Sequence, residues 1–138
     1  MLKSMGTKLV AYDGTESSQK AVERATGLLL ADDELLLLMV VPTEAIAELA
    51  EIPPDVTLQS AQETVAAEVA ELRKRNVNVR GLVKEGDIAD EILKLASEIG
   101  VDLIVIGHSG VSKVGRFAVA NVAEQVYKRS ERPVLIVK

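Results

Sequence analysis

Apolar residues gather in five short runs, and the stretches between these runs have helical spacing. The runs fall at residues 8–13, 34–41, 77–83, 102–106 and 133–137. The second run, Glu34–Val41, is apolar on both faces, which is typical of a strand covered on both sides, as in parallel sheets. The runs therefore predict five strands of a largely parallel sheet.

Each stretch between the runs places apolar residues along one helical face. These stripes lie at residues 21–29, 58–72, 88–99 and 122–127, and a further short helix is expected at 43–51. Asp87 precedes the third stripe and is predicted to cap its first turn, whereas Gly100 follows the stripe and is predicted to end the helix. The stripes therefore predict helices that pack one face against the sheet.

Strands that alternate with helices define the fold class as α/β. Crossovers between parallel strands are almost always right-handed, so we expect a doubly wound open sheet of five parallel strands flanked by helices. The expected strand order is 3-2-1-4-5, the Rossmann-like arrangement. Residues 1–138 have the length of one domain with a single core, and they show no repeat or second domain.

Composition narrows the chemistry that this domain can perform. The chain lacks cysteine and has one histidine, which excludes disulfides and argues against a multi-histidine metal centre. A net charge of −5 and only 2% aromatic residues disfavour nucleic-acid binding. No apolar run has the length of a membrane span, and the first residues lack the apolar stretch of a secretory signal, so we expect a cytoplasmic protein.

Ligands of open α/β sheets bind beyond the carboxyl ends of the strands, which directs attention to the segment Gly107–Asn121. This segment is longer than most strand-to-helix loops and has three glycines, two basic side chains and no acid. The pair Asn121 and Glu124 resembles a capping box, which predicts a helix start at Asn121. Glycines, helix-start amides and the side chains of Lys113 and Arg116 suit a phosphate group. The alternative is an ordered surface loop with turn-forming glycines and solvated charges.

The same loop resembles the signature of the universal stress protein family: Gly, two residues, Gly, nine residues, Gly, and then Ser or Thr. Gly107 and Gly110 fit the first two positions. The resemblance extends to the first strand ending at Asp13, to residues 83–86 and 101–107, and to the closing segment 132–137. It implies an adenine nucleotide alpha hydrolase-like fold and, in the ATP-binding branch of the family, a bound ATP that Mg²⁺ could accompany.

The resemblance also implies roles for individual residues. Asp13 would contact the nucleoside end of ATP, and the backbone of Val41 would face adenine. Gly107 and Gly110 would line the path of the ribose and phosphates. The amides of Ala120, Asn121 and Val122 would meet the phosphates at a helix start.

Two positions depart from the signature, because Ala120 and Asn121 stand where the ATP-binding branch has Gly and Ser or Thr. Alanine would be strained if that position needed a positive φ, but it would cost nothing in a helix. Asn121 keeps the ability to cap a helix. The second hypothesis is therefore the branch that does not bind ATP and acts as a dimeric interaction module. A third is an enzyme whose loop holds another phosphorylated metabolite.

The sequence offers no arranged catalytic group. His108 is interpreted as an exposed loop residue, because its neighbour Ser109 has no third group assigned to orient a nucleophile. Any ATP hydrolysis should therefore be slow, and the expected role is that of a sensor or regulator. The segment Pro133–Val137 should form a sheet edge, and the resemblance implies a homodimer through this strand.

Overall fold

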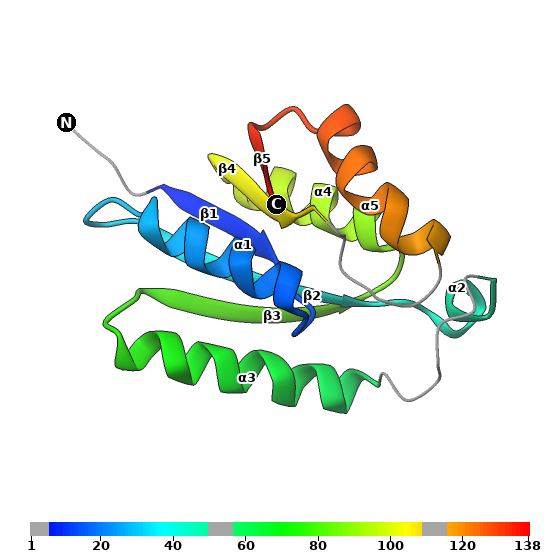
Figure 1. Ribbon diagram of the computed structural model, residues 1–138, viewed down its shortest axis with the longest axis horizontal. Coiled ribbons are helices and arrows are strands. Elements are labelled where there is room, and N and C mark those ends of the chain that lie inside the picture. Colours follow the sequence, from blue (N-terminus) through cyan, green and yellow to red (C-terminus); the bar gives the residue numbers. More distant parts are fainter. Residues whose placement is uncertain (1–5, 50–56, 109–115) are drawn as a thin grey trace.

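The computed structural model describes residues 6–49, 57–108 and 116–138. Strands and helices alternate along the described chain, apart from the successive helices α2 and α3 (Figure 1). In chain order the elements are β1 (Thr7–Ala11), α1 (Glu16–Gly27), β2 (Glu34–Val41), α2 (Glu44–Leu49), α3 (Leu58–Lys74), β3 (Val79–Glu85), α4 (Ile88–Ile99), β4 (Leu103–Gly107), α5 (Arg116–Arg129) and β5 (Val134–Val137).

The five strands form one sheet in the order β3-β2-β1-β4-β5, and every neighbouring pair is parallel. This confirms the predicted fold class and strand order. Because the strands are parallel, their carboxyl ends meet at one edge of the sheet. The short helix α2 lies beyond that edge, on the right in Figure 1.

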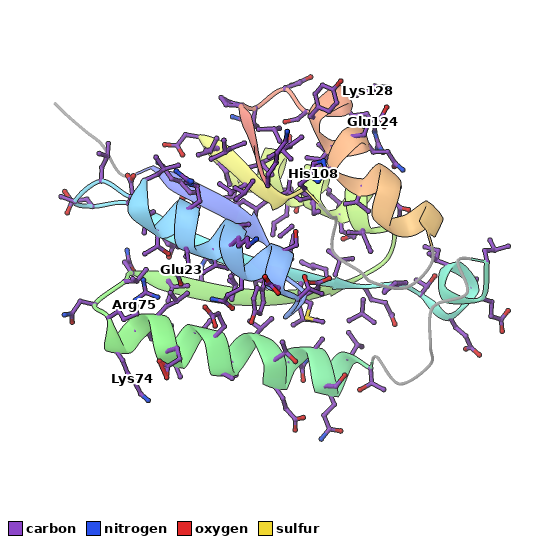
Figure 2. All side chains as sticks on the ribbon, viewed as in Figure 1. Glu23, Lys74, Arg75, His108, Glu124 and Lys128 are labelled. Carbon is purple, nitrogen blue, oxygen red and sulfur yellow. The ribbon has the colours of Figure 1, made fainter. Side chains whose placement is uncertain are left out.

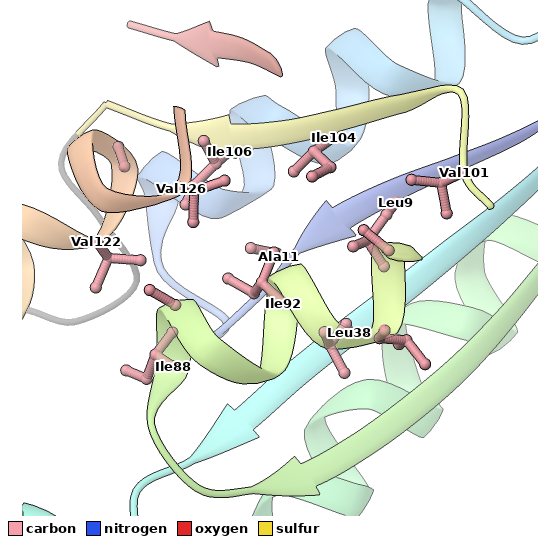
Figure 3. Close-up of a cluster of buried hydrophobic side chains, with 14 of the residues drawn as sticks. Leu9, Ala11, Leu38, Ile88, Ile92, Val101, Ile104, Ile106, Val122 and Val126 are labelled. Carbon is pink, nitrogen blue, oxygen red and sulfur yellow. The ribbon is translucent and has the colours of Figure 1, made fainter. Parts of the chain in front are cut away.

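Helices cover both faces of the sheet, so the buried apolar residues form two clusters, one on each face, rather than the single core expected from the chain length. On one face α4 and α5 pack against side chains such as Leu9, Leu38 and Ile104, all of which are almost fully buried (Figure 3). On the other face α1 and α3 cover Val10, Leu37 and their neighbours. Six of the eight residues of β2 are buried, which explains why Glu34–Val41 is apolar on both sides, and the observed bounds confirm the predicted ones.

The ends of α4 also follow the prediction. The Asp87 carboxylate accepts the Asp90 amide at 3.0 Å, and this bond caps the first turn. Gly100 ends the helix in the left-handed conformation, with φ of 77°. Threonine residues cap the starts of α1 and α3. The Thr15 side chain accepts a hydrogen bond from the Ser18 amide, and the Thr57 side chain accepts one from the Ser60 amide.

The helix α5 corrects the prediction of its start. It begins at Arg116, five residues before Asn121, so Asn121 and Glu124 do not form a capping box at the helix start. Arginine and the alanines of the Arg116–Ala120 stretch favour helix, and this propensity outweighs the short polar signal at Asn121. Glu124 instead pairs with Lys128, one turn later, at 2.6 Å (Figure 2).

Smaller corrections concern three other boundaries. The first strand ends at Ala11 rather than Asp13, and β3 lies two residues later than the run 77–83. Leu28 and Leu29, assigned to the first helical stripe, follow the end of α1, and Leu28 is 41% exposed. In each case the apolar pattern predicts the element correctly, but the residues in the adjacent turn make its predicted end differ by a few residues from the observed one.

At the amino edge of the sheet, a buried ion pair joins β1 to its neighbours. The Lys8 ammonium lies 2.9 Å from the Asp33 carboxylate and 3.3 Å from that of Asp102. Asp33 also accepts the amides of Gly6 and Leu30 at 3.1 and 2.8 Å. Burial alone would raise the pKa of Asp33, but these hydrogen bonds and the Lys8 charge outweigh it, and the pKa is lowered. The network fixes β1 between the turn before β2 and the start of β4.

Across residues 6–49, 57–108 and 116–138, no helix has both the length and the hydropathy that a membrane span requires.

Candidate functional site

The carboxyl edge of the sheet brings together three of the residues singled out from the sequence. Asp13 follows β1, Val41 ends β2 and Gly107 ends β4. β1 pairs with both β2 and β4, so the three positions lie on adjacent strands. The chain leaves β1 toward one face of the sheet and β4 toward the other. This divergence is the point where open α/β sheets bind ligands.

Asp13 is the ionisable group at the centre of this edge. One of its carboxylate oxygens, Oδ1, accepts the Thr15 hydroxyl at 2.6 Å and the Thr15 amide at 3.0 Å. The Asp13 amide donates to the Ser18 hydroxyl at 3.2 Å. Gly14, between Asp13 and Thr15, has φ of 83°, which permits the tight turn that lets the carboxylate reach forward to Thr15.

Burial raises the pKa of the Asp13 carboxyl, and the hydrogen bonds from Thr15 only partly offset that effect. A carboxylate with a raised pKa at the ligand-binding edge of an α/β sheet is a candidate functional group. Asp13 is also a turn-forming residue, because its carboxylate accepts two hydrogen bonds from Thr15. Both descriptions hold together, because the turn orients the carboxylate.

Gly107 has a packing role that the sequence does not reveal. A methyl group at this position would collide with the Ser17 hydroxyl and would lie 2.7 Å from the Ser17 carbonyl oxygen. The first turn of α1 therefore packs directly on the end of β4, and only glycine leaves room for it. Substitution of Gly107 would disturb this packing as well as any bound ligand.

The backbone of Val41 is already engaged at the end of β2. Its carbonyl oxygen accepts the Gly86 amide at 3.0 Å, and Gly86 has φ of 152°, a conformation that favours glycine. The second lone pair of that oxygen is the acceptor that Val41 can still offer. The Val41 side chain is buried among the core residues shared with α3.

The remaining predicted site residues fall after β4. Gly110 and Lys113 lie outside the described residues. Arg116, Ala120 and Asn121 belong to α5, and Val122 in the same helix is buried in the core. Because Ala120 lies within a helix, its backbone needs no positive φ and alanine causes no strain.

The early start of α5 changes which of its amides are free. In an α-helix the amide of each residue donates to the carbonyl four residues before it, and only the first-turn amides lack such a partner. With a start at Arg116, the amides of Ala120, Asn121 and Val122 have carbonyls one turn earlier as partners. The free amides are those of the first turn.

The described residues contain no cluster that could hold a metal ion, because no three acidic, histidine or cysteine side chains among them gather in the way a metal ion requires. His108 is exposed directly after β4, and its amide donates to the Val137 carbonyl at 2.6 Å (Figure 2). Ser109, its sequence neighbour, lies outside the described residues.

A surface groove of about 560 Å³ lies between the outer face of α1 and the end of β5, and its lining includes none of Asp13, Val41 and Gly107. Several of its charged side chains already have partners: Lys20 lies 3.9 Å from Glu16, and Glu23 binds Arg75 of α3 through two hydrogen bonds (Figure 2). The strand ends are the better candidate, because ligands of open α/β sheets bind where neighbouring strands diverge and the residues that line the groove belong to α1 and the end of the chain.

Sequence reasoning missed the contacts that three further residues make at this edge. Thr15 and Ser18 hold the turn after β1, and Gly86 connects β3 to Val41. The pattern Asp-Gly-Thr with serine three residues after the threonine carries the first signal, because it resembles a turn followed by an N-cap. No sequence signal pairs Gly86 with Val41, since their contact depends on strand register.

Comparison with known proteins decides the family. The model of the Universal stress protein family matches residues 5–138. The chain belongs to the universal stress protein family. It is similar to universal stress protein YxiE of Bacillus subtilis, with 31% identity over 143 residues that cover 94% of this chain and 97% of the relative.

Solved structures of universal stress proteins share the fold. One, in complex with cAMP, has a TM-score of 0.73 and 21% identity, with 99% of both chains covered. Another, from Arabidopsis thaliana with AMP bound, has a TM-score of 0.72 and 18% identity, covering 96% of this chain and 91% of that one. At these identities the likeness establishes the fold.

Proposed function

We propose that this universal stress protein binds an adenine nucleotide, ATP in particular, at the carboxyl ends of β1, β2 and β4. The observation that carries the proposal is the partly buried Asp13 carboxylate with a raised pKa, placed beside the ends of β2 and β4. Family members with this fold have been solved with AMP and cAMP bound. A sensor or regulator is the role that this site supports, because no catalytic constellation accompanies it among the described residues.

The proposed contacts follow from the chemistry of each group. The Asp13 carboxylate would accept a hydrogen bond from a ribose hydroxyl or from a donor of the base, because its negative charge would repel the phosphates. Val41 would accept a hydrogen bond from the adenine amino group. Gly107 and Gly110 would let the backbone approach the ribose and the phosphates.

The phosphates are assigned to the segment that leads into α5. Lys113 and Arg116 are its basic residues, and the first-turn amides of α5 carry the partial positive charge of a helix start. The segment contains no acid to oppose them. Mg²⁺ would bind mainly through the phosphates and water, which requires no dedicated protein cage.

The second candidate function is a dimeric interaction module that binds no nucleotide. The engagement of the Ala120 and Asn121 amides within α5 favours it, because these are the positions where the family signature has Gly and Ser or Thr. The two candidates share the fold and differ in whether ATP binds.

We further propose a homodimer through β5. This strand lies at the edge of the sheet, pairs with β4 alone, and has four partly exposed apolar residues. Edge strands of this kind favour pairing with a second copy in an isologous, two-fold arrangement. Sedimentation equilibrium should give twice the mass of the 14.8 kDa chain, and a monomeric mass at micromolar concentration would contradict the proposal.

The nucleotide proposal is tested on the purified, unlabelled protein. Denaturation should release an adenine nucleotide that chromatography identifies, and calorimetry of the nucleotide-free protein should show saturable ATP binding. GTP is the matched control, because it has the same phosphates with a different base. Absence of both released nucleotide and heat of binding at millimolar ATP would favour the interaction module.

A further inference from the structure

We propose that Thr15 is a positioning residue for the nucleotide site, through two hydrogen bonds that fix the Asp13 carboxylate at the end of β1. The inference rests on the proposed function, because Asp13 matters for binding only if a nucleotide occupies this edge. It adds a residue to which neither the sequence signature nor the family comparison assigns a role.

The hydrogen-bond lengths show how the Thr15 hydroxyl is used. It lies 2.6 Å from the Asp13 carboxylate and 3.3 Å from both the Ser18 hydroxyl and the Ser18 amide. A hydroxyl has a single proton, and the shorter contact with an ionised acceptor takes it. Thr15 therefore donates to Asp13 and accepts from the Ser18 amide.

Two bonds from one residue fix the carboxylate in direction as well as in place. The Thr15 hydroxyl and amide both end on Oδ1 of Asp13. The second oxygen, Oδ2, is the one we assign to the ligand. A carboxylate bound through one oxygen by two donors cannot rotate without losing both bonds.

The environment of the Asp13 carboxyl explains why the two hydrogen bonds from Thr15 matter for its ionisation. The neighbouring titratable group is Tyr12, directly after β1, whose pKa is raised by burial and by the negative charges of Glu68 and Asp13. Among the described residues, no cation is a cause of the shift in the Asp13 pKa, and burial opposes ionisation of the carboxyl. Uncharged donors, with Thr15 foremost, are what stabilise the ionised form.

Thr15 also caps α1, so its binding role must be separated from a structural one. The chain offers a matched control in Thr57, which caps α3 by accepting the Ser60 amide at 3.0 Å. Both residues are threonine N-caps of long helices. Only Thr15 donates to Asp13.

The experiment compares Thr15→Val, Thr15→Ser and Thr57→Val with the unchanged protein. The pKa of Asp13 is measured by carboxyl carbon NMR without ligand, and the dissociation constant of ATP is measured by calorimetry from pH 5 to pH 8. We expect Thr15→Val to raise the Asp13 pKa and to weaken ATP binding about tenfold at the acidic end, the size of one charge-assisted hydrogen bond. The loss should shrink toward pH 8. Thr15→Ser should restore both properties, and Thr57→Val should lower stability alone.

The two readouts separate the inference from the proposed function. If the Asp13 pKa is the same in Thr15→Val and in the unchanged protein, the inference is wrong, whatever ATP does. Equal weakening of ATP binding by Thr15→Val and Thr57→Val, independent of pH, would also overturn it, because both would then act through helix stability. A raised Asp13 pKa in a protein that binds no ATP at any pH would overturn the proposed function, while Thr15 would keep its effect on the carboxylate.

Discussion

Replacing Asp33 with asparagine should lower the free energy of unfolding by about 3 kcal/mol, because it leaves the buried Lys8 ammonium without its nearest counter-charge. The Asp33 side chain is only 2% exposed and that of Lys8 only 10%. Asparagine can still accept one backbone amide, but it cannot compensate the ammonium charge. Urea unfolding at pH 7 measures the loss directly.

The same variant should change the acid response of the protein. The folded-state pKa of Asp33 is lowered, so its contribution to stability is present above its ordinary pKa of 3.8 and disappears as the pH falls through the lowered folded value. The Asp33→Asn protein lacks this contribution at every pH. Its stability should therefore fall less steeply as the pH falls from 3.8 through the lowered folded-state pKa.

Asp102 provides the control for burial. It contacts the same Lys8 ammonium at 3.3 Å, but its side chain is 51% exposed. Because solvent screens an exposed pair, Asp102→Asn should cost less than about 1 kcal/mol. Equal losses for Asp33→Asn and Asp102→Asn would show that burial of the ion pair does not set its energy.

Replacing Asp13 with asparagine should weaken ATP binding at least about tenfold without lowering the free energy of unfolding. Asparagine has the shape of aspartate and can accept both hydrogen bonds from Thr15. It removes the charge that would accept a ligand hydroxyl, and hydrogen bonds to charged groups are among the strongest in proteins. Calorimetry and urea unfolding at pH 7 measure the two quantities on one preparation.

The sign of the stability effect follows from the direction of the pKa shift. The folded-state pKa of Asp13 is raised, so the folded protein binds the proton more tightly than the unfolded chain does. The stability linked to Asp13 is therefore lost as the pH rises through the interval between the ordinary and the raised pKa. At neutral pH ionised Asp13 is a cost to the fold, and its removal should leave stability equal or higher.

A stability loss of the size expected for Asp33→Asn would contradict this account of Asp13, and so would unchanged ATP affinity. Asp90→Asn is a suitable comparison. It breaks an exposed ion pair with Arg129, at 2.7 Å between α4 and α5, and should change neither quantity much.

The fold could be predicted from local pattern because the strands coincide with short apolar runs and the long helices with apolar stripes of helical spacing. Glu34–Val41 has the composition of a buried central strand. Asp87 caps a helix start with its side chain, and Gly100 ends the helix because glycine readily adopts the left-handed conformation. The start of α5 could not be found in this way. Asn121 is a residue type that favours a helix start, but the helix propensity of the preceding residues extends α5 back to Arg116.

The candidate site was predictable only in part, because its groups depend on contacts between distant residues. The sequence identifies Asp13 as an acidic residue at the end of a strand. Its pKa is raised by burial, however, and burial cannot be read from the sequence. Gly107 was found as a signature residue, whereas its contact with Ser17 requires α1 to pack on β4. Gly110 and Lys113 lie outside the described residues and stay predictions.

The position of the nucleotide is the central claim, and NMR chemical-shift mapping tests it most directly. ATP is titrated into the ¹⁵N-labelled, nucleotide-free protein, and the backbone amide shifts are followed residue by residue. We predict saturable shifts that are largest at the residues following β1, β2 and β4, including Asp13 and His108, with small changes along the outer face of α1. Shifts centred on the groove between α1 and β5, or no saturable shifts at millimolar ATP, would contradict the account.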